Sequence, residues 1–312
     1  MLGESGVESQ SARLKMSDED VSRRDFLKGV LAGAAVTAGA GWTSGCGYFE
    51  PISVPSVREP HPSWTDSRAA SRLGEDATHT ERLRVVSYNC HHYRGRKDNR
   101  TDPERIGEVL ASLDPDIVAL QESDLRDHAD SGRSRLEVVA DRVGLQPVIH
   151  PDKMTPLCWR GNAILSRFPA RAIRWYNLTV PGHNKRGAVD VELQLGHATL
   201  RIVGAHLGLD RDERAQQVGY LLDSIMRRPR RHGTVVMGDF NIWMGSSMNL
   251  AHLERYLGPS KGTKTYPSNM PVFQLDRIFA SPGPLMRRIR VHRDALAEDA
   301  SDHLPIWSDI VV

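Results

Sequence analysis

The sequence predicts an α/β fold, and three features of residues 83–312 support this prediction. Short apolar runs rich in β-branched residues are typical of buried strands. Other stretches repeat apolar residues every three to four positions, which is typical of helices that bury one face. One stretch, 188–195, alternates strictly between apolar and polar residues, as a half-buried strand does. Because both kinds of element recur along the same stretch, we expect sheets covered by helices.

Length and composition limit the number of domains and the kind of partner. The 312 residues, 39% of them hydrophobic, can bury one substantial core and do not require a second folded domain. The formal net charge at pH 7 is only +2. This balance excludes a chain that is strongly basic throughout, so a nucleic-acid-binding surface would have to come from a local patch. We expect the chain to act as a monomer.

The N-terminal segment, residues 1–46, resembles a twin-arginine export signal. Arg23-Arg24 precedes an apolar run, Gly29–Trp42, that is too short and too rich in glycine for a membrane-spanning helix. Two processing outcomes remain open. The chain is cleaved after Ala38-Gly39-Ala40, or Cys46 is acylated at the end of a lipoprotein-like box and tethers the chain to a membrane. Either outcome places the folded domain outside the cytoplasm, in the periplasm or at the cell surface.

Residues 47–80 are rich in Pro, Ser, Arg and His without any sustained period, which predicts a flexible linker before a domain at 81–312. Two cysteines, Cys90 and Cys158, remain in that domain. Outside the cytoplasm they can form a disulfide, but two small buried side chains explain them equally well. Their spacing does not decide between these alternatives.

The first predicted strands end in polar residues. The apolar strand 83–89 ends at an amide, Asn89, and a helix with an apolar face begins near Pro103. The next strand, 117–120, leads directly to Glu122. An unpaired carboxylate at the rim of a core is costly, and binding Mg²⁺ compensates for it. Asn89 and Glu122 are therefore candidate site residues, with ordinary strand ends as the alternative.

The middle of the domain supplies three further candidates. After a helix at 136–143, a strand at 161–166 is entered through Asn162. The alternating strand 188–195 turns back into a second strand at 199–205, which predicts a hairpin. Arg186 precedes the hairpin, where a guanidinium group can hold a phosphate. His206 ends it, although a structural histidine explains that position as well.

A strand that begins at Val235 leads into Asp239-Phe240-Asn241. Along an extended chain, residues two apart lie on one face, so the carboxylate of Asp239 and the amide of Asn241 are expected side by side. Such a pair can orient a water molecule and hold a phosphate oxygen without repelling it. In isolation the pattern also fits a strand that ends in a turn.

The C-terminal part contains two acidic positions and a histidine. After a helix at 248–257, a strand at 275–279 carries an inward-facing Asp276, and Asp302-His303 precedes the last strand. This arrangement allows a histidine to be held by one carboxylate while the other holds a metal or a water. The adjacent His91-His92 suggest metal ligands, but neighbouring side chains point in different directions and no third ligand lies at a helical spacing, so we interpret them as part of a solvated loop that could touch substrate.

Seven of these segments occur in an order that resembles the endonuclease/exonuclease/phosphatase superfamily of metal-dependent phosphoesterases. They are Ser87-Tyr88-Asn89, Gln121-Glu122, Gly161–Ser166, Ala205-His206-Leu207, Gly238–Asn241, Leu275–Phe279 and Ser301-Asp302-His303. The resemblance covers residues 83–312. It implies a four-layer α/β/β/α sandwich, in which two packed mixed β-sheets are flanked by helices.

The resemblance also implies a function for each candidate. Mg²⁺, with Mn²⁺ or Ca²⁺ as substitutes, would be bound by Asn89, Glu122 and Asp302. The catalytic residues would be His206, Asp239, Asn241, Asp276 and His303, and the substrate-binding residues would be Asn162 and Arg186. In this scheme Asp239 activates water, Asn241 holds a phosphate oxygen and Asp276 orients His303. His206 serves as the general acid for the leaving group.

The sequence thus predicts an exported, Mg²⁺-dependent hydrolase of phosphoesters or phosphodiesters, but it leaves the substrate open. Nucleic acid, a phospholipid head group and a small phosphodiester are all candidates. A nuclease needs a basic strip beside the site, for which the candidates are Arg94, Arg96, Lys97 and Arg100. A lipid-directed enzyme of the sphingomyelinase type would need an apolar, aromatic-tipped loop, yet Trp159, Trp175 and Trp243 have plain core interpretations. A non-catalytic binding module on the same fold would lack some of the site residues.

Overall fold

The computed structural model describes residues 82–312 except for 125–132, 149–159, 228–232, 244–246 and 283–284. The predicted export signal, the linker and the two cysteines Cys46 and Cys158 lie outside the described residues. Cys90 is described, and it is a buried free thiol. Within the described ranges, no helix is both long and apolar enough to cross a membrane.

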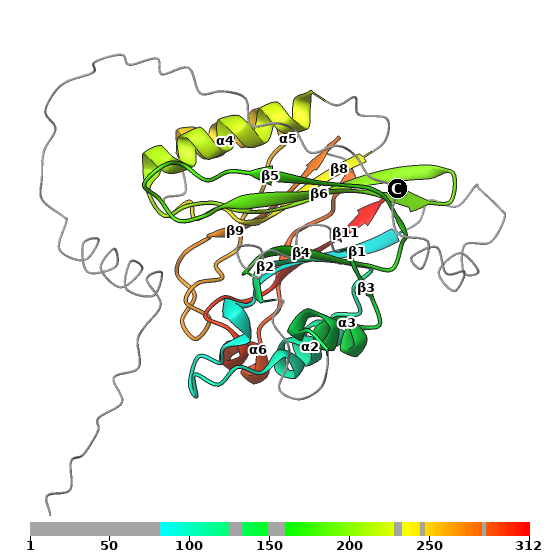
Figure 1. The fold of residues 1–312 in the computed structure, drawn as a ribbon, viewed down its shortest axis with the longest axis vertical. Helices are drawn as coiled ribbons and strands as arrows, with labels where there is room; N and C mark the ends of the chain where they lie inside the picture. The colour runs from blue at the N-terminus through cyan, green and yellow to red at the C-terminus, as the bar shows by residue number, and fades with distance from the viewer. Residues whose placement is uncertain (1–81, 125–132, 149–159, 228–232, 244–246, 283–284) are drawn as a thin grey trace, which may run out of the picture. The chain divides into compact units, whose positions relative to one another are not determined.

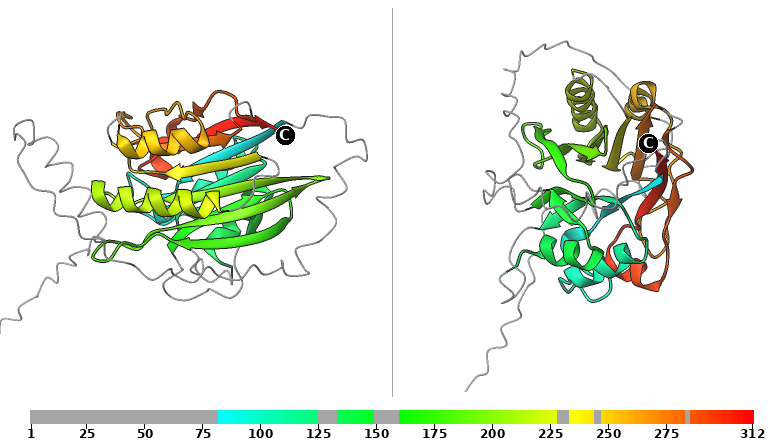
Figure 2. Two further views of the ribbon diagram at one scale, coloured as in Figure 1. Left: turned by 90° about the horizontal axis from the view of Figure 1, so that it is seen from above. Right: turned by 90° about the vertical axis from the view of Figure 1, so that its right-hand side faces the viewer.

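Two mixed β-sheets pack face to face and carry helices on their outer faces, so the four-layer sandwich is confirmed (Figures 1 and 2). One outer layer contains α4 (Arg211–Met226) and α5 (Met248–Leu257). The other contains α2 (Pro103–Ala111), α3 (Arg135–Val143) and α6 (Ala295–Ala300). Helices therefore cover both outer faces, and the two inner faces meet in the core.

The six-stranded sheet has the order β10-β11-β1-β2-β4-β3. Its strands are β1 (Arg82–Asn89), β2 (Ile117–Asp124), β3 (Gln146–Val148), β4 (Arg160–Ser166), β10 (Arg290–Val291) and β11 (Ile306–Val311). The neighbours β1 and β2 are parallel, whereas the other pairs of this sheet are antiparallel. The parallel pair brings the ends of β1 and β2 to the same edge, where Asn89 aligns with Gln121.

The five-stranded sheet has the order β5-β6-β7-β8-β9. Its strands are β5 (Ala170–Asn177), β6 (Gly187–Leu195), β7 (Ala198–His206), β8 (Gly233–Asp239) and β9 (Asp276–Ser281). The strands β6 and β7 form the predicted hairpin, and β7 and β8 are parallel. Because β9 runs antiparallel to β8, its first residue lies beside the last residue of β8.

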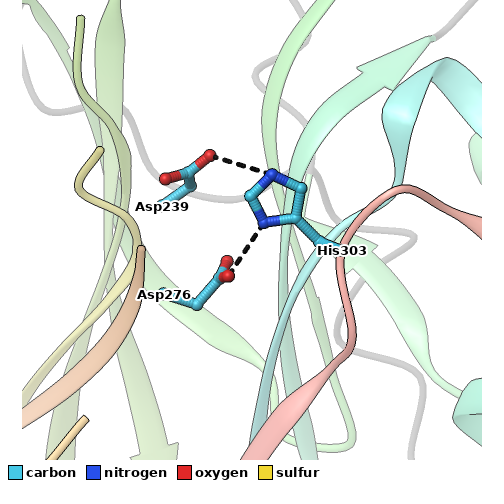
Figure 3. Close-up of side chains that lie close together, drawn as sticks. All are labelled: Asp239, Asp276 and His303. Atoms are coloured by element: carbon cyan, nitrogen blue, oxygen red, sulfur yellow. Dashed lines mark hydrogen bonds and ion pairs between the residues drawn. The ribbon is translucent and has the colours of Figure 1, made fainter. Parts of the chain in front are cut away.

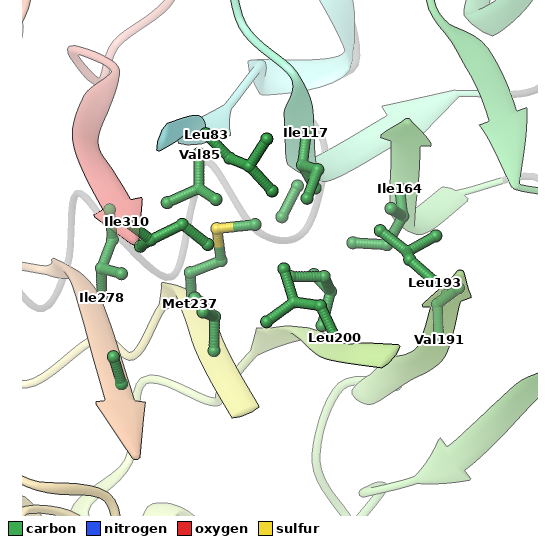
Figure 4. Close-up of a cluster of buried hydrophobic side chains, with 14 of the residues drawn as sticks. Leu83, Val85, Ile117, Ile164, Val191, Leu193, Leu200, Met237, Ile278 and Ile310 are labelled. Carbon is green, nitrogen blue, oxygen red and sulfur yellow. The ribbon is translucent and has the colours of Figure 1, made fainter. Parts of the chain in front are cut away.

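The main core fills the space between the two sheets (Figure 4). Side chains such as Val85 and Ile117 from one sheet meet Val191, Met237 and Ile278 from the other, and all five are fully buried. Burial of such side chains contributes roughly 25 cal/mol for each Å² of apolar surface removed from water. A second cluster lies between the six-stranded sheet and its helices, and a third lies between the five-stranded sheet and its helices. The three clusters fix the sheets against each other, and the site lies where the strands end.

The helices α2 and α4 begin where the sequence predicts, because a polar side chain caps each first turn. The carboxylate of Asp102 accepts a hydrogen bond from the backbone of Arg105, and Asp210 caps α4 in the same way. Such caps satisfy backbone N–H groups that have no partner within the helix. The sequence interpretation missed the short strands β3 and β10, the strand β5 and the helix α6. The six residues of α6 are too few to show an apolar stripe, and in β5 the charged residues Arg171 and Arg174 stand three positions apart, which breaks the alternation expected of a half-buried strand.

Candidate active site

Three neighbouring strands of the five-stranded sheet bring polar residues to one edge. In the register of the strands, His206 of β7 is the partner of Asp239 of β8, and Asp239 is the partner of Asp276 of β9. The side chains of all three residues are buried. The alignment explains why residues that are 70 positions apart in the sequence meet in one cluster.

His303 completes this cluster from the segment before β11 (Figure 3). Its Nδ1 lies 2.8 Å from Oδ2 of Asp276, and its Nε2 lies 3.7 Å from Oδ2 of Asp239. The same oxygen of Asp276 accepts a hydrogen bond of 2.5 Å from the hydroxyl of Thr265. A hydrogen bond at one ring nitrogen fixes the ring orientation and the tautomer, and so it determines where the other nitrogen points. Nε2 is therefore directed toward Asp239.

The surroundings of His303 favour its charged form. Complete burial lowers the pKa of His303, but the negative charges of Asp276 and Asp239 and the hydrogen bond to Asp276 outweigh burial and raise it to about 9. The imidazolium thus persists at neutral pH. Among the described residues its Nε2 has no hydrogen-bond partner, which makes it a positively charged donor available to a ligand.

Asp239 is the centre of the cluster. Its Oδ2 accepts a hydrogen bond of 3.0 Å from the amide of Asn89, which belongs to the opposite sheet, and lies 3.5 Å from Nε2 of His206. Its Oδ1 accepts a hydrogen bond from the backbone N–H of Asn241. These contacts hold both oxygens of a fully buried carboxylate in place. Asp239 therefore links the two sheets at the edge where the site lies.

Gly238 permits the approach of β8 to β7 just before Asp239. Its φ angle is 155°, and a Cβ atom at this position would lie 1.8 Å from the carbonyl oxygen of Ala205. No side chain fits at that distance. The glycine in this motif is thus required by the backbone geometry that positions Asp239.

The six-stranded sheet contributes Asn89 and Glu122. The amide nitrogen of Asn89 donates to Oε1 of Glu122 at 2.9 Å as well as to Asp239. Glu122 has a φ angle of +54°, and the pairing of β2 with β4 is irregular between Leu120 and Ser123. A bulge of this kind redirects a side chain, and a left-handed non-glycine residue is uncommon enough to be significant at a site. Both features turn the Glu122 carboxylate toward Asn89.

Asn241 and His206 lie on the other side of Asp239. The amide nitrogen of Asn241 lies 3.2 Å from Nε2 of His206 and 2.9 Å from the carbonyl oxygen of Leu207, to which it donates. Asn241 also has a left-handed backbone, with a φ angle of 50°. The structure therefore brings all five predicted catalytic residues together.

The charge balance of the cluster suits a divalent cation. Glu122, Asp239 and Asp276 are all buried carboxylates, and His303 supplies one compensating positive charge. Burying several negative charges destabilises the fold unless positive charges balance them. Carboxylate and amide oxygens are the ligands that Mg²⁺ prefers, so this ion can supply the balance. The carboxylate of Glu122 supplies such an oxygen at the buried edge of the sheet, and Asn89 carries a second one, an amide oxygen that accepts a hydrogen bond from the backbone N–H of His91.

Another trio has ligand atoms close enough for a metal. Within the described part of the chain, one such atom from each of Asp239, Asp276 and His303 lies within 4.8 Å of the others. However, Nδ1 of His303 is hydrogen-bonded to Asp276, and the raised pKa keeps the ring protonated. A histidine must be neutral to bind a metal. This trio is therefore better suited to handling protons and phosphate oxygens.

The remaining predicted residues lie at the margin of the cluster. Asp302 is half-buried and close to the hydroxyl of Ser301, which donates to the backbone carbonyl of Asn89 at 2.7 Å. Asn162 donates to the carbonyl oxygen of Gly187 at 2.6 Å and so joins the two sheets beside His206. Arg186 is half-buried, and its backbone N–H donates to the hydroxyl of Thr179.

Several residues at the site were missed or misinterpreted from the sequence. The solvated loop expected at His91-His92 is wrong, because these residues begin a short 3₁₀ helix, η3 (His91–Tyr93), and Nε2 of His92 lies 3.5 Å from the carboxylate of Glu122. Trp243 is not a plain core residue. It packs edge-on against Tyr266, whose ring lies 4.9 Å from that of His303. Thr265 had no recognisable signal, since single hydroxyl residues occur throughout the sequence.

The basic strip expected for a nuclease is partly neutralised. Arg96 and Lys97 both form ion pairs with Asp299. A guanidinium or ammonium group that is already paired contributes less to phosphate binding. Two of the four predicted basic residues are thus committed to a contact within the protein.

Comparison with known proteins agrees with this architecture. The family model of the endonuclease/exonuclease/phosphatase family matches residues 86–303. The uncharacterized protein YbhP of Escherichia coli K12 is 24% identical over 254 residues, which cover 75% of this chain and 98% of that protein.

Solved structures show the same fold at low sequence identity. A family member from Bacteroides vulgatus has a TM-score of 0.61 and 15% identity, over 74% of this chain and 98% of that one. A mannosyl-6-phosphatase from Bacteroides thetaiotaomicron has a TM-score of 0.58 and 17% identity, over 74% of this chain and 99% of that one. With its two packed sheets and a family match over most of the described residues, the chain belongs to the endonuclease/exonuclease/phosphatase family.

Proposed function

We propose that the protein hydrolyses phosphate esters with the help of a divalent cation, with Mg²⁺ as the first candidate and Mn²⁺ or Ca²⁺ as substitutes. The observation that carries this proposal is the buried contact between a carboxylate, Asp239, and a protonated histidine, His303, at the meeting edge of two sheets. Membership of the family and the fold shared with a mannosyl-6-phosphatase support it.

The cation would be held by Glu122 and Asn89, with Asp302 nearby. The fit rests on the excess of buried negative charge around these residues and on their oxygen ligands. When bound, the ion would neutralise charge on a phosphate oxygen. Asn89 would contribute its amide oxygen, the atom that accepts a hydrogen bond from the backbone N–H of His91 in this structure.

The residues of the chain would divide the chemistry of hydrolysis among them. Asp239 accepts a proton from the attacking water, whose oxygen forms a new bond to phosphorus as the bond to the leaving group breaks. His303 donates a hydrogen bond from Nε2 to a phosphoryl oxygen on which negative charge grows. His206, in its protonated form, gives a proton to the departing alkoxide; its Nε2 lies 3.5 Å from Oδ2 of Asp239.

The test is a hydrolysis panel with the purified full-length chain. The substrates are bis-p-nitrophenyl phosphate, plasmid DNA, RNA, sphingomyelin and phosphatidylinositol, each with Mg²⁺, Mn²⁺, Ca²⁺ or a chelator. We expect turnover of at least one substrate that the chelator abolishes and that Asp239→Asn lowers by about 10²–10⁴-fold. Binding of a phosphoester without turnover under every condition would favour the non-catalytic module instead.

A lipid-directed phosphodiesterase is the second candidate, and one feature favours it. The loop from Tyr266 to Phe273 exposes Met270 and Val272, with 67% and 45% of their surface accessible, close in sequence to the tyrosine that contacts His303. Apolar side chains exposed beside a site are typical of contact with lipid. Faster hydrolysis of sphingomyelin than of bis-p-nitrophenyl phosphate, lost in Met270→Ser/Val272→Ser, would establish this candidate.

We also propose that the chain is exported through the twin-arginine pathway and acts in the periplasm or at the cell surface. The support is the Arg23-Arg24 pair followed by the apolar run 29–42. Fusion of residues 1–80 to a reporter that is active only after export tests this. Reporter activity should be lost on Arg23→Lys/Arg24→Lys, and unchanged activity in that variant would exclude the pathway.

A further inference from the structure

A patch of arginines lies at the far end of the six-stranded sheet from the candidate active site. We call it the arginine patch; its members are Arg82, Arg84, Arg287, Arg288 and Arg290. Together with Asp309, four of them line a shallow pocket of about 360 Å³. The patch begins where β1 begins, whereas Asn89 ends the same strand. At about 3.3 Å per residue the two ends of β1 are roughly 23 Å apart, so the arginine patch is separate from the active site.

The positive charge of the arginine patch is largely uncompensated. Asp309 forms ion pairs with Arg82 and Arg84. The side chains of Arg287, Arg288 and Arg290 are exposed, and none of them has a carboxylate partner among the described residues. One carboxylate thus faces five guanidinium groups in a chain whose overall net charge is only +2. Such a local excess attracts polyanions.

The surroundings favour a phospholipid surface over a nucleic acid. The aromatic ring of Trp307 lies at the arginine patch, and it is already stacked by Arg84 at 4.4 Å and by Arg290 at 5.1 Å. Proteins that bind single-stranded nucleic acids offer aromatic faces on which bases stack. A ring covered by two guanidinium groups does not offer such a face, whereas arginine forks match phosphate oxygens well.

The position of the arginine patch along the chain supplies a second argument. Arg82 is the residue at which residues 1–81 join the described domain. That segment contains Cys46, for which acylation was one predicted outcome, only 36 positions before Arg82. Stable attachment by a lipid group takes a second signal such as a basic patch. If Cys46 is acylated, the attached chain enters the domain at Arg82, which belongs to the arginine patch. The surface held near the membrane would therefore be the one that carries arginines without a carboxylate partner.

We propose that the arginine patch binds the anionic phospholipids of a membrane surface. This inference does not rest on the proposed catalysis, because no member of the patch belongs to the active site. Each guanidinium group near an anionic surface strengthens binding, and the effect falls off within a Debye length. Binding should therefore weaken strongly with salt and require negatively charged lipid.

The experiment measures sedimentation of the full-length chain with vesicles of phosphatidylglycerol and phosphatidylcholine, or of phosphatidylcholine alone. Cys46→Ser is present in every protein to exclude acylation, and the N-terminal segment gives each the same background. The test variant is Arg287→Gln/Arg288→Gln/Arg290→Gln. The matched control, Arg171→Gln/Arg227→Gln/Arg255→Gln, removes the same charge from exposed positions elsewhere.

We expect the test variant to bind anionic vesicles at least about tenfold more weakly than the parent, while the control variant binds as the parent does. The temperature of thermal unfolding should be equal in all three proteins, which shows that they fold without relying on the proposed catalysis. Equal vesicle binding by test and control variants would overturn the proposal. So would a selective loss of DNA binding in the test variant, or competition by millimolar inorganic phosphate that abolishes vesicle binding, since these point to nucleic acid or to free phosphate.

Discussion

Oδ2 of Asp276 lies between two partners, 2.8 Å from Nδ1 of His303 and 2.5 Å from the hydroxyl of Thr265. The carboxylate therefore receives a hydrogen bond from a loop residue while it orients the imidazole. Both contacts are fully buried, and so neither is weakened by competition with water. Catalysis by His303 should depend on this pair of contacts, which the first predictions examine.

The rate of hydrolysis should fall at alkaline pH as His303 loses its proton. Because the pKa of His303 is raised to about 9, we expect kcat/KM to decline above that pH. Asp276→Asn removes the neighbouring charge that contributes most to the increase, so the alkaline limb should move to lower pH. The measurement is a pH–rate profile of both proteins, and an unmoved limb would show that another group controls the decline.

The free energy of unfolding should also depend on pH through His303. Its pKa in the folded state, about 9, lies above the ordinary value of 6.5. The charged ring therefore stabilises the fold fully below pH 6.5, and this contribution disappears as the pH rises through 9. Urea titrations at pH 6.5 and 9.5 measure the difference. His303→Asn cannot titrate and should show a smaller difference than the parent, and an equal difference in both would refute the assignment.

Thr265→Val should lower kcat by roughly 10–100-fold without unfolding the protein. The substitution keeps the shape of the side chain but removes the hydrogen bond to Asp276, so the Asp276–His303 pair loses its orientation. Thr263→Val is the matched control, because it makes the same change two residues earlier and its hydroxyl contacts neither member of the pair. Equal activity of the two variants would mean that the Thr265 hydroxyl is dispensable.

Glu122→Gln should weaken the binding of Mg²⁺ or Mn²⁺ by at least about tenfold, since it removes one charge from the proposed ligand set and keeps its size. Titration calorimetry with the metal alone measures this directly and does not depend on turnover. Glu108→Gln, at an exposed position on α2, is the control. If both variants bind the metal as the parent does, Glu122 is not a ligand.

Gly238→Ala should destabilise the protein severely, because the added Cβ atom would lie 1.8 Å from the backbone oxygen of Ala205. We expect a loss of more than about 3 kcal/mol. Gly219→Ala is the informative contrast: it lies exposed in α4 with no atom near the new methyl group, and it should gain up to about 1 kcal/mol. Thermal unfolding compares the two, and a tolerated alanine at 238 would contradict the steric argument.

The α/β class could be predicted from local sequence patterns because the longer strands and helices have strong periodicity and clear caps, whereas the four-layer sandwich was implied by the resemblance to the family. The site residues at strand ends, such as Asn89, Glu122 and Asp239, could also be identified, since a polar residue after an apolar run is visible without the structure. Their mutual contacts could not, because these depend on strand order and register. His92 and Thr265 were missed for a related reason: His92 lies in the three-residue helix η3 and Thr265 in a loop, and neither kind of segment leaves a periodic signal.

The alignment of His206, Asp239 and Asp276 across β7, β8 and β9 links assembly to activity. If the register between two of these strands shifted by one residue, one of the three side chains would point to the opposite face of the sheet and the catalytic cluster would not form. Misfolded forms of the chain, however compact, should consequently be inert. Recovery of turnover after refolding would then report the fraction of molecules in which all three strands have found their native alignment.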